Sequence, residues 1–115
     1  MTNEMIRVLA VRPHEMPEVI EMENTLEAKQ KFVGGWIEMC TPYEHKDTAV
    51  IICNEEGKLM GLEPNRPLYM NGIIYDVVCG NFLIVDVPED LEDFGSLSDE
   101  QIEKYTYMYS ANMDW

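Results

Sequence analysis

The chain has 115 residues, the length of one domain, and with 46% hydrophobic residues it can bury a core without a disulfide or a structural metal. Its 22 acidic and 8 basic residues give a net charge of −14, which disfavours direct binding to nucleic acid or to an anionic membrane and favours basic protein partners. No apolar run is long enough to span a bilayer and the start, MTNEM, lacks the pattern of a signal peptide, so we expect a single domain over residues 1–115 in the cytoplasm.

The first part of the chain predicts a hairpin followed by a helix. Residues 5–11 (MIRVLAV) are rich in strand formers, and residues 18–23 (EVIEME) alternate as in a strand buried on one face, with prolines in the turn between them. Asn24 is positioned to cap a helix, with Glu27 completing the box three residues later. The helix should end at Gly34, because glycine adopts the left-handed conformation that closes a helix at no steric cost.

Two more strands and an irregular segment are expected in the middle of the chain. Residues 36–40 (WIEMC) have the composition of a strand. Residues 48–54 (TAVIICN) are apolar on both faces, which predicts a central position in the sheet. Residues 58–72 contain glycine or proline at short intervals, so we expect them to be largely irregular.

The last part of the chain predicts two further strands and a second helix. Residues 73–87 form two strands that meet at a hairpin turn at Gly80-Asn81, and Ser98 with Gln101 forms a capping box for the helix. This order of elements indicates an α+β fold, with a mostly antiparallel sheet of about five or six strands and two helices packed on it. Residues 106–115 are a candidate flexible tail.

No set of residues points to an enzyme. The two histidines, His14 and His45, lack a serine or cysteine partner in a known arrangement, and no dinucleotide, phosphate-loop or zinc-protease motif occurs. The three cysteines are far apart and form no Cys-x-x-Cys pair. Cys40 with His45 is the best metal candidate, but it supplies only two ligands. We therefore expect reduced thiols and no catalytic residues, metal or cofactor.

Arg66 is the candidate for binding a small ligand. It stands between two prolines in the segment EPNRP, and a guanidinium held in this way can bind a carboxylate or phosphate through two hydrogen bonds. Asn65 beside it and the backbone at Gly35 would complete such a site. The alternative for Arg66 is an ion pair with a neighbouring acid. The alternative for Gly35 is a hinge into the next strand, which we favour.

The acidic second half of the chain is the candidate for binding a protein. Residues 67–115 carry ten acidic residues and one basic residue, and carboxylates spread along residues 86–103 resemble the phosphates of a nucleic acid in charge. Tyrosine and tryptophan near the C-terminus would add contact area or allow self-association. The candidate partner-binding residues are Asp90, Glu92, Asp93, Asp99, Glu100, Tyr107 and Trp115. The alternative is that these charges only keep the protein soluble and stabilise the second helix.

Four segments together resemble a known family. ENTLEAKQKFVGGWIE, CNEEGKLMGLEPNR, DVVCGNFLIV and SLSDEQIEKY are similar to the domain-of-unknown-function family 3846 of bacterial phages, plasmids and other mobile elements, over residues 5–105. The resemblance implies a mobile-element setting in a bacterial cytoplasm and brings no established activity. It also implies that several polar and glycine positions belong to the family's pattern: Asn24, Gly34, Gly35, Asn54, Gly57, Asn65 and Arg66.

From these observations we expect a non-enzymatic binding protein. It would bind a basic surface of a host protein, as a nucleic-acid mimic that inhibits a defence or nucleic-acid-handling system. The alternative is a small-ligand module that holds an anionic metabolite or a nucleotide signal through Arg66.

Overall fold

The computed structural model describes residues 4–42, 47–88 and 93–110. These residues form seven strands and two helices: β1 (Met5–Val11), β2 (Glu18–Glu23), α1 (Leu26–Val33), β3 (Ile37–Cys40), β4 (Ala49–Asn54), β5 (Pro64–Met70), β6 (Ile73–Cys79), β7 (Phe82–Asp86) and α2 (Asp99–Ser110). Neither of these two helices is long and apolar enough to cross a membrane. The architecture is the expected α+β fold.

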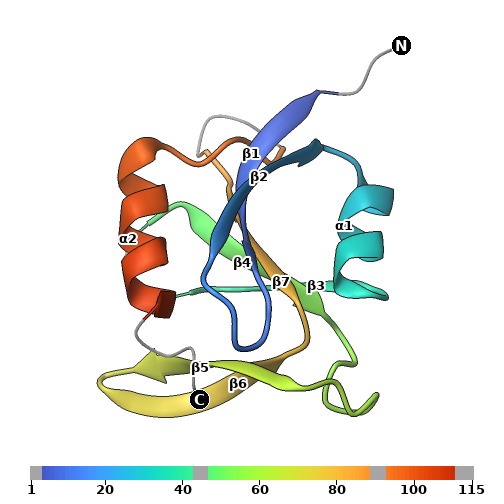
Figure 1. Cartoon of the computed structure of the whole chain (residues 1–115), viewed down its shortest axis with the longest axis vertical. Helices are drawn as coiled ribbons and strands as arrows, with labels where there is room; N and C mark the ends of the chain where they lie inside the picture. Colours follow the sequence, from blue (N-terminus) through green and yellow to red (C-terminus); the bar gives the residue numbers. More distant parts are fainter. Residues whose placement is uncertain (1–3, 43–46, 89–92, 111–115) are drawn as a thin grey trace.

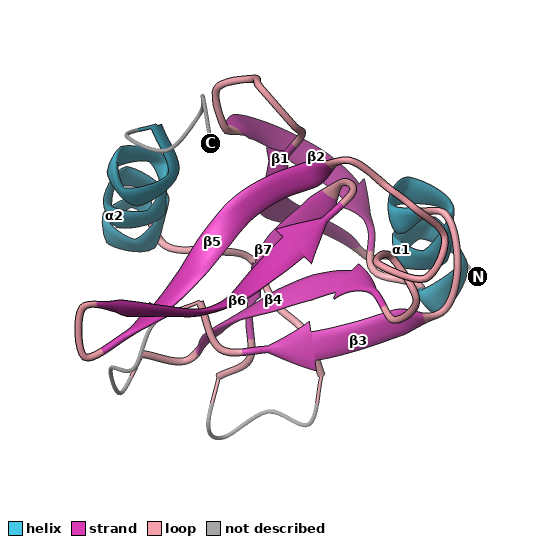
Figure 2. Ribbon diagram, turned by 90° about the horizontal axis from the view of Figure 1, so that it is seen from below, coloured by secondary structure: helices cyan, strands magenta, loops and turns pink. Residues whose placement is uncertain are grey.

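Five of the strands form one antiparallel sheet in the order β2-β1-β7-β4-β3, with β7 at its centre. The other two, β5 and β6, form a separate antiparallel ribbon. The helix α1 lies on one side of the sheet, whereas α2 and the ribbon lie on the other (Figures 1 and 2). The sheet is therefore the middle layer of the domain.

Both faces of the sheet are packed, which explains why its inner strands are apolar throughout. On the α1 side, Ile52 of β4 belongs to a buried cluster with Val33 of the helix. On the opposite side, Ile51 of β4 packs in a second cluster with Leu68 of the ribbon and Tyr105 of α2. The prediction that residues 48–54 lie inside the sheet is confirmed, since β4 runs between β7 and β3.

The prediction of an irregular segment over residues 58–72 is wrong for its second half. Pro64–Met70 is the strand β5, which turns into β6 through Asn71 and Gly72, both with positive φ (53° and 77°). β5 pairs with only one strand of the ribbon, β6. Pro67 has no backbone N–H, but because β5 has no second neighbouring strand among the described residues, no hydrogen bond is lost on that side. The register of the ribbon shifts between Pro64 and Arg66 and again between Leu68 and Tyr69.

The predicted hairpin at Gly80-Asn81 is also wrong. The strands on either side of it do not pair: β6 pairs with β5, and β7 pairs with β1 and β4. Gly80 has φ 85°, and a Cβ there would lie 2.7 Å from Leu62 Cδ1. This glycine is required where the chain leaves the ribbon and enters the sheet.

The first helix begins one residue later than expected. Thr25 is its N-cap, and the Thr25 hydroxyl accepts a hydrogen bond from the backbone N–H of Ala28 at 3.1 Å. Asn24 instead donates to the Phe94 carbonyl at 3.0 Å and accepts from Lys29 Nζ at 2.8 Å. The predicted C-terminus is confirmed, since Gly34 is the left-handed C-cap with φ 83°.

The second helix has the predicted capping box, because Ser98 and Gln101 each accept a hydrogen bond from the other's backbone N–H at 3.1 and 2.8 Å. It continues through Ser110, so residues 106–110 belong to the helix and not to a flexible tail. Tyr109 holds this last turn, since its ring is buried edge-on against Phe82. Residues 111–115 lie outside the described residues.

Candidate functional site

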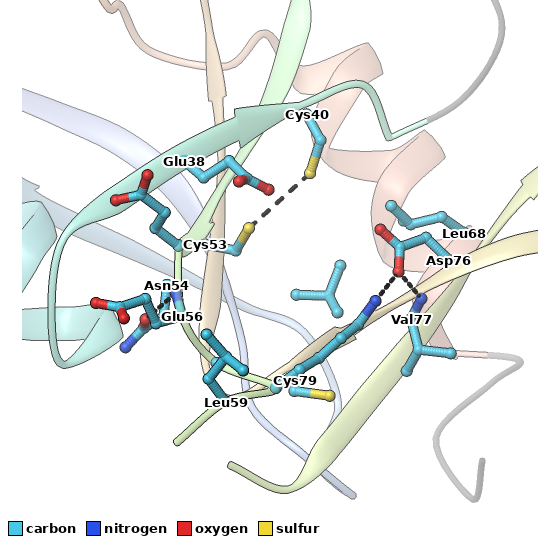
Figure 3. A pocket seen from close by; sticks show the side chains of 14 residues that line it. Glu38, Cys40, Cys53, Asn54, Glu56, Leu59, Leu68, Asp76, Val77 and Cys79 are labelled. Carbon is cyan, nitrogen blue, oxygen red and sulfur yellow. Dashed lines mark hydrogen bonds and ion pairs between the residues drawn. The ribbon is translucent and has the colours of Figure 1, made fainter. Parts of the chain in front are cut away.

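A cavity of about 300 Å³ lies between the β3–β4 edge of the sheet and the ribbon (Figure 3). It is lined by Glu38 and Cys40 of β3, Cys53 and Asn54 of β4, the turn residues 55–59, Leu68 of β5, and residues 76–79 of β6. All three cysteines of the chain line this one cavity. The fold thus gathers thiols that are far apart in the sequence.

Two of the thiols form a pair. Glu38 lies opposite Cys53 in the β3–β4 register and Cys40 lies opposite Ile51, so Cys40 and Cys53 are diagonal neighbours on the face turned toward the ribbon. Their sulfur atoms point toward each other and are 4.0 Å apart (Figure 3). Cys40, Cys53 and Cys79 are all free thiols.

The hydrogen bond between the paired thiols shifts the pKa values of Cys40 and Cys53 in opposite directions. With Cys40 as the donor, this bond lowers the pKa of Cys53, while burial and the nearby carboxylates oppose the change. The same bond, together with burial, raises the pKa of Cys40.

The wall of the cavity carries more negative than positive charge. Four carboxylates line it, from Glu38, Glu55, Glu56 and Asp76, against the single ammonium of Lys58. Lys58 is in an ion pair with Asp76, and this contact lowers the pKa of the carboxyl group. The cavity consequently favours a cation over an anion.

The predicted ligand residue Arg66 lies in the interior of the protein. Its side chain is 0% exposed, and burial lowers its pKa. Its Nε donates to the Tyr109 carbonyl at 2.8 Å, and its two terminal nitrogens donate to the Glu15 carbonyl and the Asn65 side-chain oxygen, both at 2.6 Å. Among the described residues no carboxylate pairs with it. Arg66 therefore joins chain segments through their carbonyls.

The two other predicted ligand residues also have structural contacts. Asn65 is buried and donates to the carbonyls of Val11 and Gly80, both at 2.9 Å. Gly35 packs against Asn54, because a Cβ on Gly35 would lie 3.0 Å from Asn54 Nδ2. That amide nitrogen donates to the Val33 carbonyl at 3.1 Å. Geometric support is therefore lacking for a ligand site made of Asn65, Arg66 and Gly35.

The sheet register brings acidic residues from distant parts of the chain to one end of the domain, which we name the acidic end. β1 and β4 begin there, β2 and β7 finish there, and both helices have their N-termini there (Figure 1). Its carboxylates are those of Glu4, Glu23, Glu27, Asp47, Asp86, Asp93, Asp99 and Glu100. Against four basic residues, Arg7, Lys29, Lys31 and Lys104, these eight leave a net charge of −4.

Three of the four basic residues of the acidic end are paired or buried. Arg7 forms an ion pair with Asp99 at 2.9 Å, and Lys104 forms one with Asp47 at 3.4 Å. Lys29 is 1% exposed, and burial lowers its pKa although Asp93 opposes the change. With Lys31 as the remaining exposed cation among the described residues of this end, its carboxylates present a net negative surface.

Asp47 is the one carboxyl group of the acidic end with a strongly shifted pKa. Burial alone would raise it, but hydrogen bonds from the Tyr105 hydroxyl (2.6 Å), the Gln101 amide (3.0 Å) and the Thr48 backbone lower the pKa of Asp47 to about 2. Burial, together with the hydrogen bond to Asp47, raises the pKa of Tyr105. Asp47 thus ties the start of β4 to α2 and is a structural carboxylate.

The predicted partner-binding residues fall into two groups. Asp93, Asp99 and Glu100 are exposed at the acidic end, and Tyr107 is 70% exposed on α2. Asp90, Glu92 and Trp115 lie outside the described residues, as does His45. Tyr107 is the third residue on a solvent-facing stripe of α2 with Glu100 and Glu103, whose spacing places them on one helix face.

The thiol cavity was not predicted from the sequence. The signal that could have found it is alternation: Cys40 and Cys53 both occupy the inward-facing positions of strands that were correctly predicted. Within the described ranges no three histidine, cysteine, aspartate or glutamate side chains are gathered closely enough to enclose a metal ion. A four-ligand zinc site is therefore not formed by this part of the chain.

Comparison with known proteins places the chain in a family without a known function. No curated protein and no solved structure matches it. Residues 6–110 match the family described as Domain of unknown function (DUF3846). The match ends five residues beyond the segment 5–105 expected from the resemblance, so it includes the end of α2. Because the match spans nearly the whole chain, the protein belongs to this family.

Proposed function

We propose that this domain is a non-enzymatic binding protein whose acidic end docks on a basic surface of another protein. The observation that carries the proposal is the gathering of eight carboxylates at one end of the sheet, where three of the four cations are paired or buried. A net charge of −4 on one end attracts a basic surface over several ångströms and accelerates association with it.

The arrangement also supports the finer proposal that the partner normally holds nucleic acid. Carboxylates contributed by strand ends, a loop and two helix N-termini form a broad negative surface, as a phosphate backbone does. Tyr107, 70% exposed on the neighbouring face of α2, offers apolar contact area beside it. We include a mobile-element origin and a bacterial cytoplasm in this proposal.

The alternative of an anionic ligand held by Arg66 is less well supported. The guanidinium is buried and its nitrogens donate to carbonyl groups of the chain itself. A ligand could reach it only after the β1–β2 turn and the end of α2 had moved away.

Affinity capture from a bacterial lysate tests the proposal, with two variants of equal charge. The first replaces three exposed acids of the acidic end, Glu23→Gln, Asp93→Asn and Glu100→Gln. The second replaces three exposed acids at the opposite end, Glu15→Gln, Glu55→Gln and Glu56→Gln. A basic protein retained by the wild type and by the second variant, and lost from the first variant and at high salt, is the expected result.

Equal retention by the two variants would mean that the position of the charge is irrelevant, and the proposal would be wrong. Duplex DNA added to the captured complex separates the finer proposal from the coarser one. Release of the partner by DNA supports nucleic-acid mimicry, whereas a complex that resists DNA and dissolves in salt supports a basic surface of another kind.

A further inference from the structure

We infer that Cys40 and Cys53 form a binding site for one soft, thiophilic metal ion, of which Cu⁺ is the biological representative. Thiolate sulfur is the protein ligand that selects such ions over harder cations. The two thiols belong to adjacent strands of the rigid sheet and point toward each other at the wall of the cavity (Figure 3). The site is therefore built before the ion arrives.

The distance between the sulfurs suits an ion held between them. With metal–sulfur bonds of about 2.3 Å, two sulfurs 4.0 Å apart enclose an angle of roughly 120° at the metal. That is the angle of a three-coordinate ion, and Cu⁺ accepts two or three ligands. The thiols need little movement to bind, whereas a disulfide would require them to approach to about 2.05 Å.

The surroundings supply charge and room for a further ligand. Glu38 lies directly opposite Cys53 in the register and Asp76 lines the same cavity, so the ion enters a negative environment. The cavity of about 300 Å³ leaves the third coordination position open to water or to a small thiol. Glu55, Glu56 and Lys58 at its wall are exposed, so the cavity is reached from solvent.

Binding of the ion changes no oxidation state, so it needs no oxidant or reductant. Each cysteine gives its proton to solvent, and each thiolate donates an electron pair to the ion. A tetrahedral ion such as Zn²⁺ would need four ligands, and the described segments do not bring a third cysteine, histidine or carboxylate into the coordination sphere. A low-coordinate ion fits the two thiols as they stand.

The site is independent of the acidic end. No residue that lines the cavity belongs to the acidic end, and β4 separates the two, since it begins at the acidic end and contributes Cys53 and Asn54 to the cavity from its other end. A partner bound at the acidic end would leave the thiols reachable, and failure of either proposal leaves the other unchanged.

The test is an anaerobic titration of the reduced full-length chain with Cu⁺ in competition with a chromogenic Cu⁺ chelator. We expect one ion per chain, with Cys40→Ser and Cys53→Ser each weakening binding at least about 100-fold. Cys79→Ser is the matched control, because Cys79 lines the cavity but is not in the pair. It should change the affinity by no more than about threefold. Circular dichroism shows whether each variant is folded.

X-ray absorption at the copper edge measures the ligands of the ion in the wild-type complex, so this test needs no substituted protein. Two sulfur neighbours at about 2.3 Å support the site. An ion that the chelator removes completely, a loss of binding in Cys79→Ser equal to that in Cys53→Ser, or a coordination sphere without sulfur would overturn it.

Discussion

The Nε atom of Arg66 donates a hydrogen bond to the backbone carbonyl of Tyr109 across 2.8 Å, and both side chains are completely or almost completely buried. Tyr109 is next to the last residue of α2, so this carbonyl is one of those that a helix leaves unpaired at its C-terminus. The guanidinium places a positive charge at the negative end of the helix dipole. Arg66 is thus a C-terminal cap supplied by a strand distant in sequence.

Arg66→Ala should destabilise the protein by about 3 kcal/mol or more, because it leaves several buried carbonyls without donors and opens a cavity. Urea unfolding followed by circular dichroism measures the change in the free energy of unfolding. Arg12→Ala is the control, since Arg12 forms a partly exposed ion pair with Glu18 and lies over the Phe32 ring, and its loss should cost about 1 kcal/mol. Equal losses in the two variants would contradict the capping role.

Gly35→Ala should cost about 1 kcal/mol, because the new Cβ would lie 3.0 Å from Asn54 Nδ2. The cost should shrink when Asn54→Ala is also present, and a double-mutant cycle measures this coupling. Gly34→Ala provides the contrast: its penalty comes from φ 83° and should be unaffected by the Asn54 substitution. A zero coupling energy at Gly35 would show that the two residues do not interact.

Thr25→Ala should lower the free energy of unfolding by about 1 kcal/mol and accelerate hydrogen exchange at the Ala28 amide, which bonds to the Thr25 hydroxyl at 3.1 Å. Asn24→Ala should act differently, since Asn24 holds Lys29 and Phe94. It should leave the Ala28 amide protected while destabilising the 93–98 segment. If Asn24→Ala exposed the Ala28 amide as strongly as Thr25→Ala, the cap would have been assigned to the wrong residue.

Asp47 should make the stability of the protein fall in acid. Its folded-state pKa of about 2 is below the usual value of 3.8, so its contribution is complete above about pH 4 and disappears as the pH falls toward 2. The contribution is on the order of 2 kcal/mol at neutral pH. Unfolding measured at several pH values should show a smaller acid loss in Asp47→Asn. Glu103→Gln, at an exposed position of α2, should retain the wild-type profile.

Much of the fold could be predicted because local patterns and the final structure agree. The alternation of residues 18–23, the double-sided apolar character of residues 48–54, and the Ser98–Gln101 box each depend on interactions close in sequence. The N-terminus of α1 was placed one residue early because Asn24 and Thr25 are both good caps. In the structure the Asn24 side chain instead donates a hydrogen bond to the carbonyl of Phe94, a residue distant in sequence.

The ribbon and the candidate sites were harder to predict for the same reason. Pro64 and Pro67 argue locally against a strand, and only the pairing of β5 with β6 overrides them. Arg66 looked available because its acceptors come from the β1–β2 turn and from α2, which are not its neighbours in sequence. The acidic end was foreseen in part, since half of its charge comes from the second half of the chain.

The Arg66 contact with Tyr109 has a consequence for how the protein is made. A nascent chain that still lacks α2 has an uncovered sheet face and a guanidinium without one of its acceptors. The described part of the domain can therefore complete its fold only after α2 has left the ribosome. Truncation within α2 should then yield insoluble protein, and a C-terminal fusion needs a linker long enough to let that helix dock.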